Sequence, residues 1–223
     1  MTIGTGVGVD IREVEGIDEL DAVESLFSTI WSTGPERPPL NREVLRAFAH
    51  TGCYVAAAYE GDAMVAASAG FLGGGGADEL HLHSHITGVL PAAQGRHIGL
   101  ALKLHQRAWC LERGIDVVTW TFDPLVRRNA WFNLHRLGAD IVELVPDFYG
   151  DMSDGINAGS ASDRFVARWA LPSAASRPAI VPGDGDVVVP VEPSSRRALR
   201  DAYTSGLHVV GMTAAGADYV LRD

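Results

Sequence analysis

The chain has 223 residues, 47% of them hydrophobic, and a formal net charge of -10 at pH 7. This length accommodates one domain, or one domain with an appendage, and the hydrophobic fraction supplies a sizeable core. The negative charge disfavours a nucleic-acid partner, which needs a basic surface, but it is compatible with a small anion held by backbone N–H groups.

The cysteines and the N-terminal residues favour a soluble, cytoplasmic protein. Cys53 and Cys110 have neither metal-ligand spacing nor the number that a disulfide framework needs, so we expect reduced thiols. Residues 1–12 lack the basic and apolar regions of a signal peptide. The most apolar stretch, 63–77, is too short and too rich in glycine to span a bilayer, so we expect no membrane partner.

The first half of the chain predicts one strand, then two helices, then three consecutive strands. Residues 17–31 carry apolar side chains at helical spacing behind an acidic first turn, and Asn41 is a suitable N-cap for a short helix ending at His50. Alternating or apolar runs between turn residues predict strands at 9–14, 54–59, 63–71 and 80–90.

The second half predicts helices that alternate with strands. The helix at 98–113 would bury a stripe formed by Leu100, Leu104, Ala108 and Leu111. A second helix, 127–137, is stopped by Gly138. Further strands are predicted at 117–122, 141–145 and 165–171, followed by a linker at 172–185, a strand at 187–191, a helix at 194–205 and one or two short strands.

This order of elements predicts a mixed α/β (α+β) fold with a mainly antiparallel central sheet flanked by helices. We predict a main domain at 1–172. Residues 173–223 would form a linker and a small C-terminal strand-helix-strand extension packed on that domain.

The turn after the 80–90 strand has the composition of an anion site. It reads Gln94-Gly95-Arg96-His97-Ile98-Gly99 and opens the 98–113 helix. A turn of this kind directs backbone N–H groups and the positive end of the helix dipole toward one point, which suits a phosphate or diphosphate. The two glycines would let a ligand approach the backbone closely, and the arginine adds a positive charge.

The whole run resembles the first motif of the GNAT superfamily of N-acetyltransferases. In that family a strand ending in Val-x-Pro precedes Gln/Arg-x-x-Gly-x-Gly/Ala, whose amides bind the diphosphate of acetyl-CoA. Val89, Pro91, Gln94 and Gly99 match, whereas His97 stands where the first motif glycine is usual. The resemblance implies that acetyl-CoA or another acyl-CoA contacts Val89, Gln94, Gly95, Arg96, His97, Ile98, Gly99, Leu100 and Asn129.

The helix from Asn129 to Gly138 is similar to the family's second motif. The family's common Tyr, often the acid that protonates the CoA thiolate, is replaced by Leu134, and Asn129 lies nearer to Gly138 than the family's Asn does. Tyr149 and His135 are therefore the candidates for the acid.

Three histidines stand on alternate positions, and two of them, His83 and His85, are the candidates for the base. Strand alternation places His81, His83, His85, Thr87 and Val89 on one face. The resemblance implies that the Val89 N–H polarises the thioester carbonyl, and that His83 and His85 lie in the register where the family removes the substrate proton. Two alternatives stay open: these histidines satisfy polar neighbours in a cleft wall, or the His-x-His pair binds zinc.

The resemblance implies an acyl-CoA-dependent N-acetyltransferase, and the acidic charge favours a cationic small-molecule amine as acceptor over nucleic acid. The 146–163 loop, with its aspartates, would close over such an acceptor or form a solvated connection. The alternatives are a peptide N-terminus as acceptor, an atypical acceptor or decarboxylation on the same scaffold, a non-catalytic acyl-CoA-binding module, and a metal hydrolase. Exposed strand edges in the tail could pair across a homodimer, although nothing in the sequence requires one.

Overall fold

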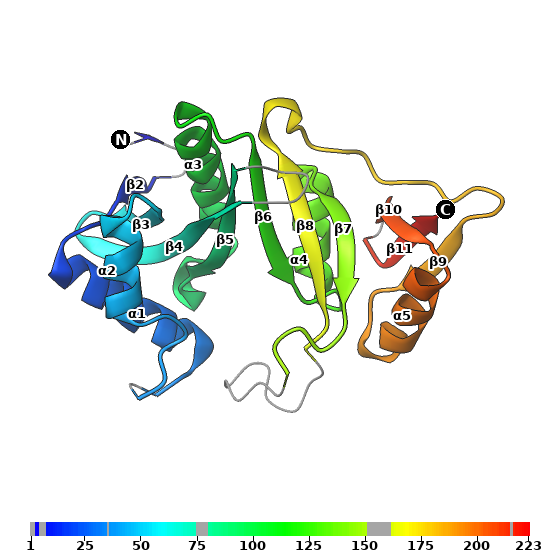
Figure 1. Ribbon diagram of the computed structural model, residues 1–223, viewed down its shortest axis with the longest axis horizontal. Helices are drawn as coiled ribbons and strands as arrows, with labels where there is room; N and C mark the ends of the chain where they lie inside the picture. The colour runs from blue at the N-terminus through cyan, green and yellow to red at the C-terminus, as the bar shows by residue number, and fades with distance from the viewer. Residues whose placement is uncertain (1–2, 5–7, 35, 75–79, 151–161, 215) are drawn as a thin grey trace. The chain divides into compact units, whose positions relative to one another are not determined.

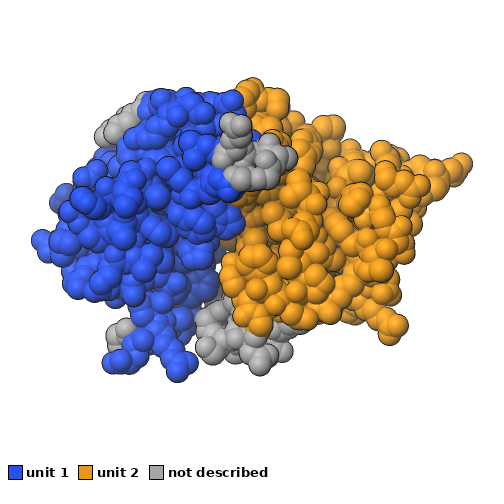
Figure 2. All heavy atoms as spheres, in the orientation of Figure 1, with its two compact units in different colours: residues 1–118, 153–158 blue, residues 119–152, 159–223 orange. Residues whose placement is uncertain are grey.

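The computed structural model describes residues 3–4, 8–34, 36–74, 80–150, 162–214 and 216–223. Their contacts form two compact units, shown in Figure 2. Unit 1 comprises residues 1–118 and 153–158, and unit 2 comprises residues 119–152 and 159–223. The predicted division at residue 172 stays a prediction, because these units divide the chain at other positions.

Unit 1 contains an antiparallel sheet whose strands lie in sequence order (Figure 1). The strands are β1 (Ile3–Gly4), β2 (Asp10–Glu13), β3 (Tyr54–Glu60), β4 (Ala63–Gly74) and β5 (Leu80–Val89). Its helices are α1 (Ile17–Trp31), α2 (Arg42–His50) and α3 (Ile98–Glu112), with a short 3-10 turn at Pro91–Ala93. Strand β1 was not predicted, and the other elements match their predicted positions closely.

One face of this sheet packs under α1 and α2. Leu20, Val23 and Phe27 of α1 are fully buried in a cluster with Leu45 of α2 and with small residues of β3 and β4. The Asn41 side chain accepts a hydrogen bond from Val44 N at 3.0 Å, so the predicted cap is confirmed.

The other face packs under α3, but not by the stripe that the sequence predicts. Leu104 and Leu111 are 48% and 38% exposed, whereas Ile98, Leu102 and Trp109 are buried. The prediction was wrong because polar residues share the buried side: Lys103, His105 and Gln106 all lie against the sheet. Their hydrogen bonds, such as Tyr54 OH to His105 Nδ1 at 2.9 Å, compensate for that burial.

Unit 2 continues from Thr119 within β6 (Val117–Phe122). It contains α4 (Arg127–Trp131), a π-helical turn (Phe132–Leu137), and the antiparallel pair β7 (Asp140–Val145) and β8 (Arg164–Ala170). Gly138 ends the helix with φ 72°, as predicted, and a side chain there would also collide with Ala175 O of the following linker.

The C-terminal residues form a three-stranded antiparallel sheet and one helix within unit 2 (Figure 1). A 3-10 turn at Leu171–Ser173 leads to β9 (Val187–Pro190), and a second one at Pro193–Ser195 leads to α5 (Arg196–Thr204). The last elements are β10 (His208–Met212) and β11 (Asp218–Arg222). The fully buried Tyr219 packs on Phe165 of β8, and its hydroxyl donates to Pro124 O at 2.5 Å. Both units are mixed α/β with mainly antiparallel strands flanked by helices, which confirms the predicted fold class.

Cys53 and Cys110 are free thiols, and Cys110 is buried. Among the described residues, no helix is both long and apolar enough to cross a membrane. No group of three or more potential metal ligands occurs in the part of the chain that the structure describes.

Candidate active site

The turn between β5 and α3 presents its backbone to solvent, as the sequence predicts. Gln94, Gly95, Arg96 and His97 are all exposed. Gly95 has φ 78°, a left-handed conformation that glycine adopts without strain. Added Cβ atoms would meet nothing within 4 Å at Gly95 and only Val89 Cγ2, at 3.8 Å, at Gly99. A ligand can therefore approach the backbone at both glycines.

The first turn of α3 supplies the hydrogen-bond donors of this site. The first bond of the helix runs from Ala101 N to His97 O at 3.0 Å, so Ile98, Gly99 and Leu100 have N–H groups without acceptors inside the helix. The helix is 15 residues long, and its dipole places partial positive charge at these donors. Donor geometry and dipole both fit a diphosphate.

His97 holds the backbone conformation that the motif glycine would have. It is the N-cap of α3 with φ 61° and ψ 11°, and its side chain makes no capping hydrogen bond. A left-handed conformation costs a residue with a Cβ about 1–2 kcal/mol. The substitution therefore keeps the turn open and introduces local backbone strain.

Arg96 is paired within unit 1 rather than extended into solvent. Its guanidinium contacts the Glu60 carboxylate at the end of β3, and both side chains are partly exposed. An exposed pair of this kind contributes little to stability, so it can open at small cost. Arg96 is thus available to an anion in the turn, with Glu60 as its competitor.

The end of β5 leaves the Val89 N–H directed away from β4. Leu90 N donates to Val65 O at 3.0 Å, so the adjacent pair of Val89 and Ala66 is a non-hydrogen-bonded pair of the antiparallel ladder. The Gln94 side chain donates to Val89 O at 3.1 Å, which fixes the strand end against the turn.

A β-bulge lies in the middle of the histidine row. Ala69 pairs with Ile86 and Phe71 with His83, so Ser84 and His85 together oppose Gly70. A side chain on Gly70 would come within 2.6 Å of His83 O, and the bulge therefore requires glycine there.

The bulge interrupts the predicted alternation of side chains. His83 lies on the face of α2, because its ring contacts Phe71, which itself contacts Phe48 of α2. Ile86 packs into the cluster under α1 and α2. Thr87 lies on the opposite face, where its hydroxyl bonds Ser68 Oγ at 2.8 Å. The prediction that the histidines share one face with Thr87 and Val89 was therefore wrong.

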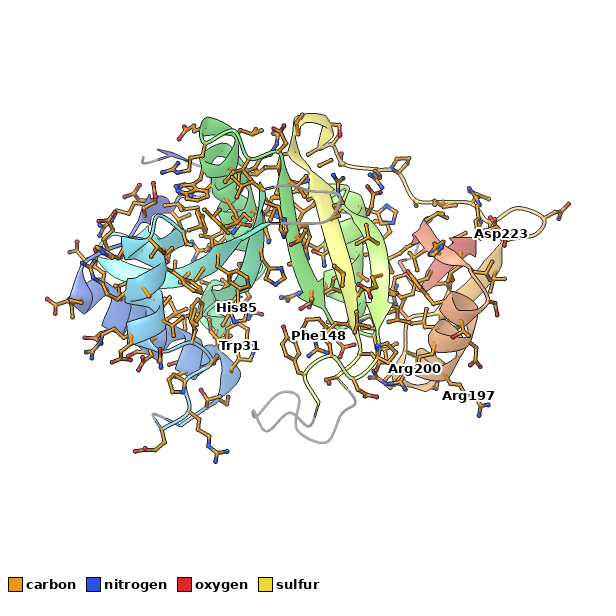
Figure 3. The ribbon with its side chains drawn as sticks, in the orientation of Figure 1. Trp31, His85, Phe148, Arg197, Arg200 and Asp223 are labelled. Carbon is orange, nitrogen blue, oxygen red and sulfur yellow. The ribbon has the colours of Figure 1, made fainter. Side chains whose placement is uncertain are left out.

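The structure brings His83 and His85 together with one aromatic ring (Figure 3 labels His85). Phe71 lies 5.0 Å from the His83 ring and 5.9 Å from the His85 ring, and the two imidazoles are 6.4 Å apart, between centroids. Burial, with the nearby His85, lowers the pKa of His83 to about 4, and burial also lowers the pKa of His85. Both imidazoles are therefore neutral at pH 7.

Lys103 supports the bulge from the face of α3. Its ammonium donates to Ser84 Oγ at 2.8 Å and to Gln106 Oε1 at 3.2 Å, and burial lowers its pKa to about 7. Sequence reasoning missed Gly70, Phe71 and Lys103. A glycine inside an apolar strand is the usual signal of a bulge, but the lysine gave no signal because its helical position also suits a solvated face.

Two predicted site residues lie in unit 2. Asn129 is exposed in the first turn of α4. Tyr149 is 44% exposed, its hydroxyl lies 3.1 Å from Thr121 Oγ1, and the Arg164 guanidinium lies 5.3 Å from its ring. Its hydroxyl is thus accessible and hydrogen-bonded, as a proton donor requires.

Residues of the π-helical turn are packed inside unit 2. Leu134, at the position of the family's Tyr, is 3% exposed. His135 is also 3% exposed, stacks on Trp131 at 4.1 Å, and binds the backbone of Arg177 through its Nδ1 and its carbonyl. These contacts make His135 an anchor for the linker, so Tyr149 is the stronger candidate for the acid.

Comparisons with known proteins agree on the fold alone. No protein-family model matches the sequence, and no curated protein matches it. Among solved structures, the Escherichia coli ribosomal-protein-S18-alanine N-acetyltransferase aligns with TM-score 0.54 and 14% identity over 79% of this chain and 97% of its own. The Drosophila melanogaster polyamine N-acetyltransferase, which forms N-acetylagmatine, aligns with TM-score 0.55 and 16% identity over 73% and 99%.

A third structure is Salmonella typhimurium yncA with its cofactor acetyl-CoA, at TM-score 0.56 and 13% identity over 79% of this chain and 98% of its own. Identities this low carry the architecture and no more. The resemblance seen in the two motifs is confirmed at that level: the chain has the fold of the GNAT acetyltransferases.

Proposed function

We propose that this chain is an acyl-CoA-dependent N-acyltransferase that transfers acetyl from acetyl-CoA to an amine. The observation that carries the proposal is the exposed turn from Gln94 to Gly99, where donors from the start of α3 converge within a GNAT fold. The solved structure of yncA with acetyl-CoA supports the choice of co-substrate.

The turn and its flanks would hold the co-substrate. Ile98, Gly99 and Leu100 N–H groups, with Arg96 released from Glu60, would bind the diphosphate. Gln94 and His97 line the same turn. Bound acetyl-CoA supplies the acyl group as a thioester.

The residues of β5 would activate the two reacting groups. The Val89 N–H would donate to the thioester oxygen, which gains negative charge as the amine attacks. His85, the more exposed of the two imidazoles, would take the ammonium proton directly or through water, with His83 beside it. Because both imidazoles are neutral at pH 7, they can accept that proton without first losing one.

Departure of the thiolate needs one proton, which we assign to Tyr149. Its hydroxyl is exposed and already hydrogen-bonded to Thr121, so it can donate and be reprotonated from solvent. The overall change balances: the ammonium nitrogen loses two protons, of which one passes through the imidazole to solvent and one replaces the proton given to the thiolate. An amide bond replaces the thioester bond, and CoA leaves as the thiol.

We propose a small, cationic amine as the acceptor. The net charge of -10 favours the approach of a cation. The solved neighbours act on both kinds of acceptor, since one forms N-acetylagmatine and another acetylates a ribosomal protein. A peptide N-terminus is therefore the comparison that the experiment must include.

The test is incubation with acetyl-CoA and a panel of polyamines, amino-sugar amines and short peptides, with product mass and free thiol as readouts. We expect a product heavier by one acetyl group with a polyamine-like acceptor. His85→Gln and His83→Gln should lower kcat by about 100-fold, the size of a lost general base. His81→Gln, on the same strand, is the matched control and should keep activity. Thiol release without acetylated product would overturn the proposal.

A further inference from the structure

We propose that the C-terminal extension, through Arg200 of α5, positions the first residues of the β7–β8 connection, 146–150, and so places the proposed acid Tyr149. This inference rests on the proposed function, because it assigns Tyr149 to the acid step. Arg200 is a positioning residue: it contacts no reacting atom and acts through two aspartates.

Asp163 is the centre of this contact. Asp163 immediately precedes β8, and its side chain is 2% exposed. It accepts hydrogen bonds from Arg200 Nε at 2.9 Å and from a second Arg200 nitrogen, and Arg196 NH1 lies 3.2 Å away. A buried carboxylate requires such partners, because an unpaired charge inside a protein is strongly destabilising. The two arginines of α5 therefore fix Asp163.

Asp147, two residues after the end of β7, is held by Asp163 and Arg200. Its N–H donates to Asp163 Oδ1 at 3.1 Å, and its own carboxylate lies 3.2 Å from Arg200 NH2. Asp147 has φ 50°, a left-handed conformation that costs a non-glycine residue free energy. Arg200 thus supplies a contact that stabilises the strained backbone at Asp147.

The strained turn determines where the next two side chains lie. Phe148 N donates to Ser162 O, and Tyr149 N donates to Ser162 Oγ, each at 3.1 Å. Ser162 Oγ in turn donates to Gly150 O at 2.8 Å. The Phe148 and Tyr149 rings meet edge to face at 4.6 Å. These bonds connect Arg200, through Asp163 and Asp147, to the backbone of Tyr149.

The helix itself offers a matched control. Figure 3 labels Arg197 and Arg200 on α5 and Phe148 in the connection. Arg197 is 93% exposed and pairs only with the exposed Asp201 of its own helix among the described residues. Arg200→Gln and Arg197→Gln remove the same charge from the same helix, but only the first removes contacts with the connection.

The first measurement is amide hydrogen exchange in the full-length protein. We expect exchange in the peptide that contains Phe148 and Tyr149 to be about tenfold faster in Arg200→Gln, since loss of one buried partner is worth about one decade in a local opening equilibrium. Arg197→Gln should exchange like the wild type. Equal exchange in the two variants would overturn the inference, whatever reaction the protein catalyses.

The second measurement separates positioning from a general loss of structure. In Arg200→Gln, kcat/KM for the acceptor should fall about tenfold or more, while the Kd for acetyl-CoA stays at the wild-type value. Arg200→Lys should restore part of that loss. A fall in acetyl-CoA affinity of the same size would contradict the inference, and an inactive wild type with faster exchange in Arg200→Gln would instead contradict the proposed function alone.

Discussion

Replacement of His97 by glycine tests the strain in the ligand-binding turn. His97 has φ 61° and ψ 11°, is exposed, and makes no capping hydrogen bond. Glycine removes a left-handed penalty of about 1–2 kcal/mol and adds about 0.5–1 kcal/mol of unfolded-state entropy. His97→Gly should therefore be more stable than the wild type by roughly 0.5–1 kcal/mol, which raises Tm by about 1–4 °C for a chain of this size.

The comparison with alanine decides whether the backbone is the cause. His97→Ala keeps the left-handed penalty and should unfold within about 0.5 kcal/mol of the wild type, as surface substitutions do. Gly95→Ala, at φ 78°, should be less stable by about 1 kcal/mol. The assay is urea unfolding followed by tryptophan fluorescence. A His97→Gly variant no more stable than His97→Ala would refute the positive φ and the strain inferred from it.

Three further predictions concern buried groups. The His83 imidazole should titrate near pH 4 by NMR. Because the folded state favours the neutral imidazole, the free energy of unfolding should fall as pH decreases from 6.5 toward 4. A titration midpoint near 6.5 would contradict the burial of His83. Burial opposes the charge of Asp163, but hydrogen bonds from Arg200 and the Asp147 N–H outweigh it and lower its pKa to about 2. Its stabilisation of roughly 2 kcal/mol should therefore be lost between about pH 4 and 2, and Asp163→Asn should abolish that dependence. Tyr219→Phe should destabilise the protein by about 1–3 kcal/mol in urea unfolding, because Pro124 O loses its buried donor; an unchanged midpoint would show that the bond contributes nothing.

Local patterns were sufficient to predict most elements and the turn. The α1 helix has the predicted bounds because its apolar spacing and its acidic first turn are local features. The turn from Gln94 to Gly99 was predicted for the same reason, since two glycines and the start of a helix lie next to each other in sequence.

Long-range partners explain what the sequence could not predict. The bulge in β5 depends on Gly70, which lies on another strand, so a strict period of two along 81–89 gave the wrong face for Thr87. Lys103 can lie on the buried side of α3 because Ser84 of β5 accepts a hydrogen bond from its ammonium. The contacts of Arg200 with Asp163 span 37 positions, beyond the reach of periodicity.

The central claim is that the turn at the start of α3 binds acyl-CoA, and thermal unfolding with acetyl-CoA tests it most directly. At a ligand concentration near 100 times Kd, the wild type should gain about 2.7 kcal/mol, or roughly 5–10 °C in Tm. Gly99→Asp, for which the fold has room, should keep the unliganded Tm within a few degrees and lose the shift, because its carboxylate repels the diphosphate. A folded wild type whose Tm does not change with acetyl-CoA, or a Gly99→Asp variant with the full shift, would contradict the account.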